Sequence, residues 1–542
     1  MKFAAFVLWQ LSLFAFGEEY IVDPGPQYKA TKGEVWPKPN SQVKHDTYFI
    51  VRPQLFRFKA NDSSGCFVLR EALIRYSNII NDHYGIIAEN LETVDHEFHK
   101  KTWLADKNYL GSLSSLDITF SEPCNDKEYP KLNMDEKYQL NITKEAAVLK
   151  AATIWGILRG LETFSQLLYI GNEQLSLRIN TTSIVDYPRF THRGLLLDTS
   201  RHFIPVRKIL TTLDAMAYNK FNVFHWHIVD DQSFPYVSVK YPELSDKGAY
   251  YRKQIYSVDE VQQIIHYARL RGIRVMPEFD TPGHTRSWGV AHPEILTACE
   301  GNFTGKLGPI DPSKEIVYDF LEGLFEEIHE TFPEEYVHLG GDEVGFECWK
   351  SNSNITKFMA KNNIFDYFSL ESYYVQKVIN MVEKLGSKSV VWEEVFSNGV
   401  KLPSDTIVHV WLNSSTVSEV ISSGKPALLS ACWYLDDLDM GGDWQKYYSC
   451  EPNNFARNGT QRKLLLGGEA CMWAEAVNEH NVISRVWPRA SATAEKLWSN
   501  ENITTVDEAT LRLEEHACRM NRRRIEAQPP NGPGFCLGRG EF

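Results

Sequence analysis

From residue 192 onward, the chain repeats one pattern, in which a short apolar run is followed by a longer segment whose apolar residues recur every three or four positions. The short runs predict buried strands, and the longer segments predict amphipathic helices. The predicted strands are Gly194–Leu197, Asn222–Val229, Gly272–Phe279, Tyr336–Leu339, Ser389–Val395, Ile407–Leu412, Ala427–Ala431 and Leu464–Met472. The predicted helices between them include Val206–Tyr218, Val258–Arg271, Glu315–Thr331 and Phe368–Leu385. Eight strand units that alternate with helices predict a (β/α)8 barrel, the TIM-barrel architecture.

Residues 18–185 show a different pattern of predicted strands and helices. Short strands such as Leu116–Phe120 mix with helices, and one helical stretch is predicted at Glu145–Leu168. The pattern predicts a smaller α+β domain at residues 18–185, followed by the α/β barrel domain at residues 186–542. A doubly wound open sheet would also alternate, but it usually has fewer strands and a glycine-rich nucleotide turn. The sequence contains no G-x-G-x-x-G.

The first 17 residues form a segment of their own. They contain one lysine, a short apolar run and small residues at Ala15 and Gly17, which is typical of a secretory signal peptide and too short for a convincing membrane span. No later stretch reaches about 18 uninterrupted apolar residues, so we expect no membrane span in the mature protein. The N-x-Ser/Thr sequons, which are candidates for N-glycosylation, are Asn61, Asn141, Asn180, Asn302, Asn354, Asn413, Asn458 and Asn502. Their density fits a protein of the secretory pathway.

Charge and cysteine content narrow the function classes. The net charge of −13 and the pI near 5.7 argue against a nucleic-acid partner and are compatible with an acidic compartment. Nine cysteines in an oxidising compartment predict several disulfides and at least one free thiol. The sequence has no C-x-x-C, which argues against a zinc or redox centre. Cys471, inside the apolar segment Leu464–Trp473, is the candidate for a buried free thiol.

Reactive and aromatic side chains follow the predicted strands, at the end where TIM barrels carry their active sites. The first four strands lead into Asp198-Thr-Ser-Arg-His202, His225-Trp-His-Ile-Val-Asp-Asp231, Glu278-Phe-Asp-Thr-Pro-Gly-His284 and Asp342-Glu343. The later strands supply Trp392, Trp411, Trp433-Tyr434 with Asp436, and Trp473 with Glu475. Packing alone explains eight such coincidences poorly, so we expect an acidic pocket walled by aromatic rings.

The segment Tyr336–Val344 is the strongest candidate for the chemistry. A short apolar strand runs into two glycines and then into the adjacent acids Asp342 and Glu343. The glycines allow a sharp turn and a close approach. Two neighbouring carboxylates repel each other, so one of them is expected to have a raised pKa and to serve as a general acid. The competing interpretation is a solvated acidic turn.

The other candidates also have structural alternatives. Arg201 is either a surface cation or a residue whose guanidinium forms paired hydrogen bonds with vicinal hydroxyls or acids. His225 and His227 have metal-ligand spacing, but packing inside the barrel explains the pair equally well. His284 is either a loop histidine or the partner of an acid. The three strand-end tryptophans are either core residues or an apolar box for a ligand.

A pair of carboxylates is the common equipment of glycoside hydrolases. In the usual retaining mechanism, the acid and the nucleophile lie about 5–5.5 Å apart across the anomeric carbon. Asp342 and Glu343 are neighbours in sequence and are poorly placed to straddle a sugar in this way. A substrate that provides its own nucleophile would remove this difficulty.

The chain resembles the family 20 glycoside hydrolases, and closely the lysosomal β-N-acetylhexosaminidase subunits of the beta type, over essentially the whole mature chain. The segments that carry the resemblance are Arg193-Gly-Leu-Leu-Leu-Asp-Thr-Ser-Arg-His202, Asn222-Val-Phe-His-Trp-His-Ile-Val-Asp-Asp231, Glu278-Phe-Asp-Thr-Pro-Gly-His-Thr285, His338-Leu-Gly-Gly-Asp-Glu-Val344 and Gly468-Glu-Ala-Cys-Met-Trp473. The resemblance implies an exo-acting, retaining enzyme that removes terminal β-linked GlcNAc or GalNAc from glycoconjugates or chitin oligomers. It implies no metal or other cofactor. It also implies a homodimer, or a heterodimer with a paralogous subunit, in the lysosome or outside the cell.

The resemblance further implies roles for the site residues. Glu343 is expected to be the general acid and then the base. Asp342 is expected to orient the 2-acetamido group, whose carbonyl oxygen attacks the anomeric carbon to give an oxazoline-type intermediate. Tyr434 is expected to hydrogen-bond that oxygen, and Asp230 and His284 to support Glu343. The residues expected to line the acetamide pocket and the floor under the sugar are Trp392, Trp411 and Trp473, and those expected to hold hydroxyls are Arg201, Asp436 and Glu475.

Family pairing implies three disulfides and leaves Cys471 free. These disulfides are Cys66–Cys124, Cys299–Cys348 and Cys518–Cys536. Cys432 and Cys450 are then left over, and we predict a fourth disulfide between them, which would close the loop that carries Tyr434.

Two features depart from the family pattern. Asp436 matches the subunit type that prefers neutral substrates, and Asp437 stands where the type that accepts sulfated sugars has an arginine. We therefore expect poor activity on 6-sulfated GlcNAc. Met440 stands where relatives have an aromatic residue that reaches into the partner's site, so this detail of the dimer is not implied for this chain.

Three rival functions remain to be weighed. A carbohydrate-binding protein without turnover would not need the complete set of acids beside Arg201 and Tyr434. A metal-dependent barrel hydrolase would be excluded by insensitivity to a chelator. The string Gly-Gly-Asp-Glu also occurs in cyclic-dinucleotide synthases, but the signal peptide and the missing nucleotide turn argue against that class.

Overall fold

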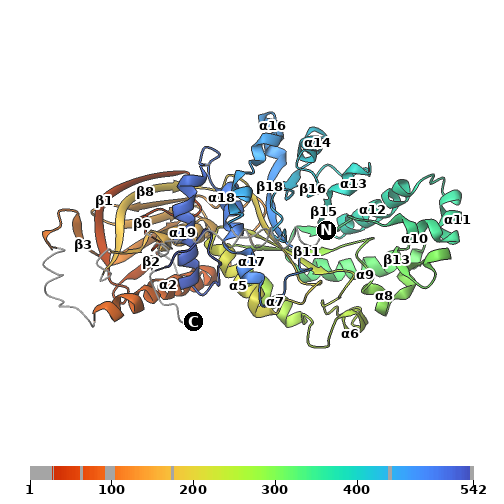
Figure 1. Ribbon diagram of the computed structural model, residues 1–542, viewed down its shortest axis with the longest axis horizontal. Helices are drawn as coiled ribbons and strands as arrows, with labels where there is room; N and C mark the ends of the chain where they lie inside the picture. Colours follow the sequence, from red (N-terminus) through yellow and green to blue (C-terminus); the bar gives the residue numbers. More distant parts are fainter. Residues whose placement is uncertain are drawn as a thin grey trace, which may run out of the picture.

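The computed structural model describes residues 27–28, 30–60, 65–91, 104–171, 176–437, 442–503 and 505–536. Two sheets organise the molecule, an open sheet at one end and a closed barrel at the other (Figure 1). The predicted signal peptide at residues 1–17, the sequon at Asn61 and the departure at Met440 lie outside the described residues. Within the described part of the chain, no helix is long and apolar enough to cross a membrane.

The open sheet is built from the first part of the chain and has the strand order β2-β4-β6-β5-β8-β1-β3, with β7 paired to β8. Its strands are β1 (Ser41–Val51), β2 (Arg57–Ala60), β3 (Tyr109–Leu113), β4 (Ser115–Phe120), β5 (Tyr138–Ile142), β6 (Ala147–Ala151), β7 (Tyr169–Ile170) and β8 (Leu177–Asp186). Helices α2 (Phe67–Leu91) and α4 (Ile154–Leu167) pack on it and on each other. This α+β arrangement agrees with the predicted class, and the division at residue 185 stays a prediction.

The helix predicted to begin at Glu145 begins at Ile154, so its first part was wrong. Residues Ala147–Ala151 form strand β6, which pairs with β4 and β5 and alternates buried with more exposed positions. Thr153 then caps α4, because its hydroxyl accepts a hydrogen bond of 3.2 Å from the backbone N–H of Gly156. In the sequence, the apolar residues of β6 and α4 together resemble one helical pattern.

The second sheet is a closed barrel of eight parallel strands, which confirms the predicted (β/α)8 fold. Its strands are β9 (His192–Asp198), β10 (Val223–Val229), β11 (Arg274–Phe279), β14 (Tyr336–His338), β15 (Lys388–Trp392), β16 (Ile407–Val410), β17 (Ala427–Leu429) and β18 (Leu465–Met472). The strand predicted to end at Val395 stops at Trp392, because helix α13 (Glu393–Ser397) begins there. The longer helices of this part are α5 (Val206–Tyr218), α7 (Val258–Arg269), α9 (Glu315–Thr331), α12 (Tyr367–Lys384), α18 (Arg489–Trp498) and α19 (Val506–Arg522).

Buried ion pairs fix the open sheet to the barrel. Glu136, from the first part, accepts hydrogen bonds from Arg159 of α4 at 2.8 Å and from Arg193 of β9 at 2.6 and 2.7 Å. All three side chains are buried, so removal of one partner would leave an uncompensated charge and cost about 3–5 kcal/mol. The two parts of the chain are therefore held in a fixed relation.

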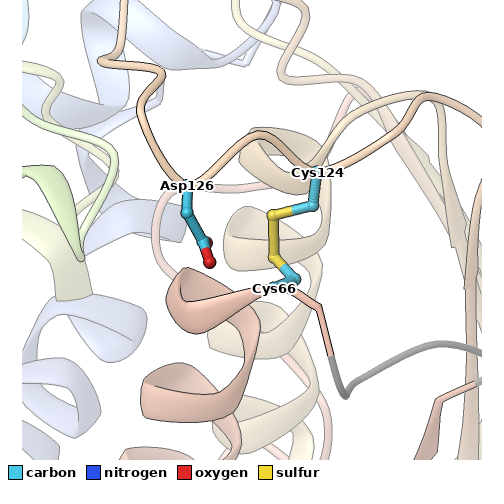
Figure 2. Close-up of side chains that lie close together, drawn as sticks. All are labelled: Cys66, Cys124 and Asp126. Carbon is cyan, nitrogen blue, oxygen red and sulfur yellow. A yellow bond between two sulfur atoms is a disulfide. The ribbon is translucent and has the colours of Figure 1, made fainter.

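The structure contains four disulfides, which join the four cysteine pairs named above. Cys471 is buried and has no disulfide partner among the described cysteines. Figure 2 shows the Cys66–Cys124 disulfide beside Asp126. The carboxylate of Asp126 accepts a hydrogen bond of 2.8 Å from the backbone N–H of Phe67, at the first residue of α2. The disulfide and this hydrogen bond thus fix the start of α2.

Candidate active site

The segment after β14 turns sharply, as the two glycines predict. Gly340 and Gly341 have φ angles of 71° and 95°, in the left-handed region that glycine adopts without strain. A Cβ on Gly340 would lie 1.6 Å from Oδ1 of Asp280, and one on Gly341 would lie 2.4 Å from Val395. The glycines therefore allow Asp280 to approach the backbone that leads into Asp342.

The two adjacent acids occupy different environments. Asp342 is buried, whereas 62% of the Glu343 side chain is exposed. Glu343 lines a cavity of about 840 Å³ together with His284, Phe303 and Lys306. Its φ angle is +49°, a conformation that costs a non-glycine residue on the order of 1–3 kcal/mol and persists only where the surroundings impose it. Glu343 thus faces open space, and Asp342 faces the interior.

His284 lies between the two acids. Its Nε2 is 3.6 Å from Oδ2 of Asp342 and 3.6 Å from Oε2 of Glu343, and its Nδ1 is 3.1 Å from Oδ1 of Asp230. Burial alone lowers the pKa of His284, but Asp280 and Asp342 outweigh it and, with Asp230, raise the pKa to about 11. The imidazole is therefore a cation at neutral and acidic pH, as the interpretation of a partner for an acid requires.

Asp280 is a site residue to which no role was assigned from the sequence. It is buried, and its Oδ1 accepts a hydrogen bond of 3.0 Å from the backbone N–H of Gly341. Burial and the nearby carboxylate of Asp342 raise the pKa of Asp280 well above its usual range. Burial and Asp342 thus favour the protonated form of Asp280. Its spacing of two from Glu278, along the same strand end, was the available signal, since such residues share a face.

Arg201 is held inside the site by acids. Its guanidinium lies 2.9 Å from Oδ2 of Asp230, 3.2 Å from Oδ2 of Asp198 and 3.9 Å from Oε1 of Glu475. It also lies over the ring of Trp473, 5.1 Å from the centroid. The surface-cation alternative is therefore wrong, because only 11% of this side chain is exposed.

The aromatic residues form one wall. Trp392 lies against Trp411 and Trp473, with ring centroids 6.4 and 6.0 Å apart, and Trp411 stacks on Tyr434 at 5.9 Å. Burial, with a contribution from Asp342, raises the pKa of Tyr434 well above its usual range, so its hydroxyl keeps a proton that it can donate. The tryptophans and the tyrosine therefore form one cluster, and Tyr434 lies near enough to Asp342 for its charge to act on the hydroxyl.

Two further acids lie at this wall. Burial raises the pKa of Asp436 to about 6, and the Glu475 carboxylate adds to the effect. Glu394, which the sequence did not single out, accepts a hydrogen bond of 2.8 Å from the indole nitrogen of Trp411. It directly follows Trp392 and Glu393 in the sequence, and a second acid at that strand end was the signal for it.

The histidine pair of β10 points into the barrel. Nδ1 of His225 lies 2.7 Å from Oε2 of Glu469, and its Nε2 lies 2.9 Å from Oε2 of Glu278. His227 lies 2.7 Å from Glu278 and 2.8 Å from Asp230. His225, Glu278 and His338 are near enough to one another to share an ion, but the carboxylates already face the imidazoles at hydrogen-bonding distance. Interior packing through ion pairs accounts for this spacing.

Acids and aromatic rings gather at the carboxyl ends of the barrel strands. Of the two adjacent acids, one is open to a cavity and the other is buried, and such a set of side chains in this fold is typical of a glycoside hydrolase. Sequence comparison makes the class specific. The model of the "Glycosyl hydrolase family 20, catalytic domain" matches residues 190–501, and a model described as "beta-acetyl hexosaminidase like" matches residues 35–167. The chain belongs to glycoside hydrolase family 20, and its activity is that of a β-N-acetylhexosaminidase.

Similar proteins cover nearly the whole chain. The beta-hexosaminidase subunit beta of Homo sapiens is 45% identical, over 95% of this chain and 90% of the relative. The subunit alpha of Rattus norvegicus is 46% identical, over 93% of this chain and 94% of the relative. Among solved structures, the chitobiase of Flavobacterium johnsoniae is 29% identical, with a TM-score of 0.76 over 91% of this chain and 73% of that chain. The exo β-N-acetylglucosaminidase of Vibrio harveyi, 24% identical with a TM-score of 0.74 over 94% of this chain and 80% of that chain, shares the fold.

Proposed function

We propose that this hexosaminidase removes terminal non-reducing GlcNAc and GalNAc with retention, and that the acetamide of the substrate is the nucleophile. The observation that supports this mechanism is the division of the acid pair. Asp342 is buried near Tyr434 of the aromatic wall, and Glu343 opens onto the cavity. Adjacent residues with such different surroundings suit two different tasks on one substrate better than they suit an acid and a nucleophile across one carbon.

In the proposed reaction, Glu343 protonates the glycosidic oxygen, and the leaving group departs into the cavity. Asp342 accepts a hydrogen bond from the acetamide N–H, which increases the negative charge on the carbonyl oxygen. Tyr434 donates to that oxygen while it attacks the anomeric carbon. Water then opens the oxazoline-type intermediate, with Glu343 as the base. The cation of His284 lies 3.6 Å from both acids and would stabilise whichever of them is ionised.

The remaining site residues would hold the sugar. We propose that Arg201, Asp436 and Glu475 bind ring hydroxyls, while Trp392, Trp411 and Trp473 line the acetamide pocket and the floor. Because Arg201 is already paired with Asp198 and Asp230, it is pre-oriented for hydroxyls rather than free to swing. Asp437 is an exposed acid beside Asp436, so we propose a preference for neutral over 6-sulfated sugars.

The decisive experiment is hydrolysis of aryl N-acetylglucosaminide and N-acetylgalactosaminide by wild type and by Glu343→Gln. We expect at least about a 100-fold loss of kcat in the variant, with both substrates affected alike. Glu335→Gln is the matched control, since Glu335 is partly exposed at the opposite end of β14 and pairs with Lys388. Full activity in Glu343→Gln would overturn the mechanism.

We also propose that the chain passes through the secretory pathway, is glycosylated and works as a dimer, as a lysosomal or secreted enzyme. Its relatives are described as beta-hexosaminidase subunits. The sequons that are exposed in the described residues are Asn302, Asn354, Asn413, Asn458 and Asn502. Asn180 is less suited to a glycan, because its amide already binds the backbone oxygen of His45 and the hydroxyl of Tyr169.

A further inference from the structure

A line of close contacts runs from the interior of the barrel to Glu343. It begins at Glu278 of β11, whose Oε2 lies 2.7 Å from Nδ1 of His227. Nε2 of His227 lies 2.8 Å from Oδ2 of Asp230, and the other oxygen of Asp230 lies 3.1 Å from Nδ1 of His284. His284 then reaches Glu343 at 3.6 Å. Glu278 and His227 are fully buried, so water does not screen these contacts.

The carboxylate of Glu278 also holds the aromatic wall. Oε1 of Glu278 accepts a hydrogen bond of 2.8 Å from the indole nitrogen of Trp392. Trp392 is buried at the end of β15 and stacks on His409, with centroids 4.3 Å apart and planes 24° apart. The position of Trp392 therefore depends on two buried partners, Glu278 and His409. One oxygen of Glu278 fixes the wall, and the other fixes His227.

The charges along the line alternate. Burial raises the pKa of Glu278, but His338, His227 and His225 outweigh it and hold the pKa well below its usual range. Burial lowers the pKa of His227, but Glu278 and Asp230 raise it well above its usual range. Carboxylate, imidazolium, carboxylate and imidazolium thus follow one another from Glu278 to His284. Loss of the first charge would leave His227 with a single ionic partner among these four residues.

We propose that Glu278 and His227 are positioning residues of the reaction. His227 fixes the carboxylate of Asp230, and Glu278 fixes both His227 and the Trp392 wall. In this way the proton-transfer group and the acetamide pocket keep one relative placement. The proposal rests on the proposed function, because it assigns one supporting network to both the general acid and the acetamide pocket.

The barrel contains a matched control. Glu469 of β18 is equally buried and faces two histidines, His192 at 2.5 Å and His225 at 2.7 Å, where Glu278 faces three. In the described part of the chain, its hydrogen bonds reach neither Trp392 nor Asp230. Glu469→Gln therefore removes a carboxylate of the same burial that reaches the line to Glu343 only indirectly, through His225, whose Nε2 lies 2.9 Å from Oε2 of Glu278.

The test compares Glu278→Gln, His227→Gln and Glu469→Gln in the full chain. The readouts are thermal unfolding, the pH profile of kcat on an aryl N-acetylglucosaminide, and inhibition by a thiazoline analogue of the oxazoline intermediate. We expect Glu278→Gln to lower kcat about 10- to 100-fold, to shift the pH profile and to weaken thiazoline binding. His227→Gln should shift the profile in the same way but bind the thiazoline within about threefold of wild type, because the Trp392 contact remains.

Glu469→Gln should lose thermal stability as Glu278→Gln does, but keep the shape of the wild-type profile and its thiazoline affinity. Equal effects of Glu278→Gln and Glu469→Gln on all three readouts would overturn the proposal. If Glu278→Gln does not fold, an unchanged pH profile in His227→Gln would overturn it instead. Failure of the proposed function is distinguishable, because it would appear as full activity in Glu343→Gln.

Discussion

The indole nitrogen of Trp411 donates a hydrogen bond of 2.8 Å to Oε2 of Glu394, so one wall of the aromatic box is held by a titratable acid. Burial raises the pKa of Glu394 to about 7, and the neighbouring charge of Asp342 adds to the effect. Below pH 7, Asp342 therefore has a neutral neighbour, and above pH 7 it has an anionic one. The ionisation of Glu394 adds a second negative charge where the acetamide N–H is expected to bind.

Glu394→Gln should make the loss of activity above pH 7 shallower, because glutamine keeps an acceptor for Trp411 but does not ionise. Activity near pH 5 should stay within about threefold of wild type, since Glu394 is neutral there in the native enzyme. The measurement is kcat/KM on an aryl N-acetylglucosaminide between pH 4 and 9. Glu371→Gln is the control, because burial raises the pKa of Glu371 also to about 7, and this side chain binds Asn398 instead of Trp411. Identical alkaline limbs in Glu394→Gln and wild type would contradict the prediction.

Asp280→Asn should retain most of the activity, whereas Asp280→Ala should lose it. Burial and Asp342 favour a protonated Asp280, and an asparagine amide can replace that donor. Alanine would leave Asp342 without this donor and Gly341 without its acceptor, at a cost of about 1.5–3 kcal/mol, or about 10- to 150-fold in rate. Steady-state kinetics at pH 5 with a thermal unfolding control would check this. Equal losses in both variants would show that the charge of Asp280, rather than its proton, matters.

The sequence predicted the barrel and the placement of the candidate site residues at strand ends, because both depend on local order. Strand ends such as Gly340–Glu343 show their turn residues and acids directly in the chain. The proton next to Asp342 was not predictable in this way, because its holder, Asp280, comes from a different strand. The repulsion was expected between the sequence neighbours Asp342 and Glu343, whereas the structure raises the pKa of Asp280 through Asp342. Burial and distance in space determine such pKa shifts, and neither can be derived from the spacing of residues along the sequence.

The error at Glu145 has a similar origin. The alternation of β6 is only five residues long, and its buried positions continue into the apolar face of α4 with little interruption. Pairing of Leu149 with Ile118 and Leu140 on the neighbouring strands determines the strand. Neither partner lies inside the segment Glu145–Leu168, so the periodicity of that segment alone favoured one helix.

The exposed residue Asp437 should limit activity on charged sugars. It is exposed and lies 3.4 Å from the ammonium of Lys446, a surface pair of about 0–1 kcal/mol that leaves its charge accessible to a substrate. We expect wild type to hydrolyse an aryl GlcNAc at least about tenfold more efficiently than its 6-sulfated form. Asp437→Arg combined with Asp436→Asn should reduce this ratio, and Lys446→Gln alone should not. Comparable efficiency of wild type on both substrates would refute the prediction.

Three buried or nearly buried histidines make the fold less stable at alkaline pH. Glu469 and Glu278 outweigh burial and raise the pKa of His225 to about 9, and the pKa of His284 is raised to about 11. The pKa of His227 is raised well above its usual range by Glu278 and Asp230. A histidine with a raised folded pKa contributes stability that is complete below the unfolded pKa, near 6.5, and is lost as pH rises through the folded pKa. The free energy of unfolding should therefore fall from about pH 6.5 to pH 9 and beyond.

Urea unfolding at pH 6.5, 7.5 and 8.5 would measure this slope. The variant His225→Gln should be less stable than wild type at pH 6.5, because Glu469 and Glu278 lose a cationic partner. Its slope should be shallower, by at most about 1.4 kcal/mol per pH unit, since one proton fewer is released. His480→Gln is the control, because His480 is exposed and should leave the slope unchanged. A wild-type free energy of unfolding that rises over this interval would mean that these histidines are neutral in the folded protein. The alternating charges that lead to Glu343 would then be absent.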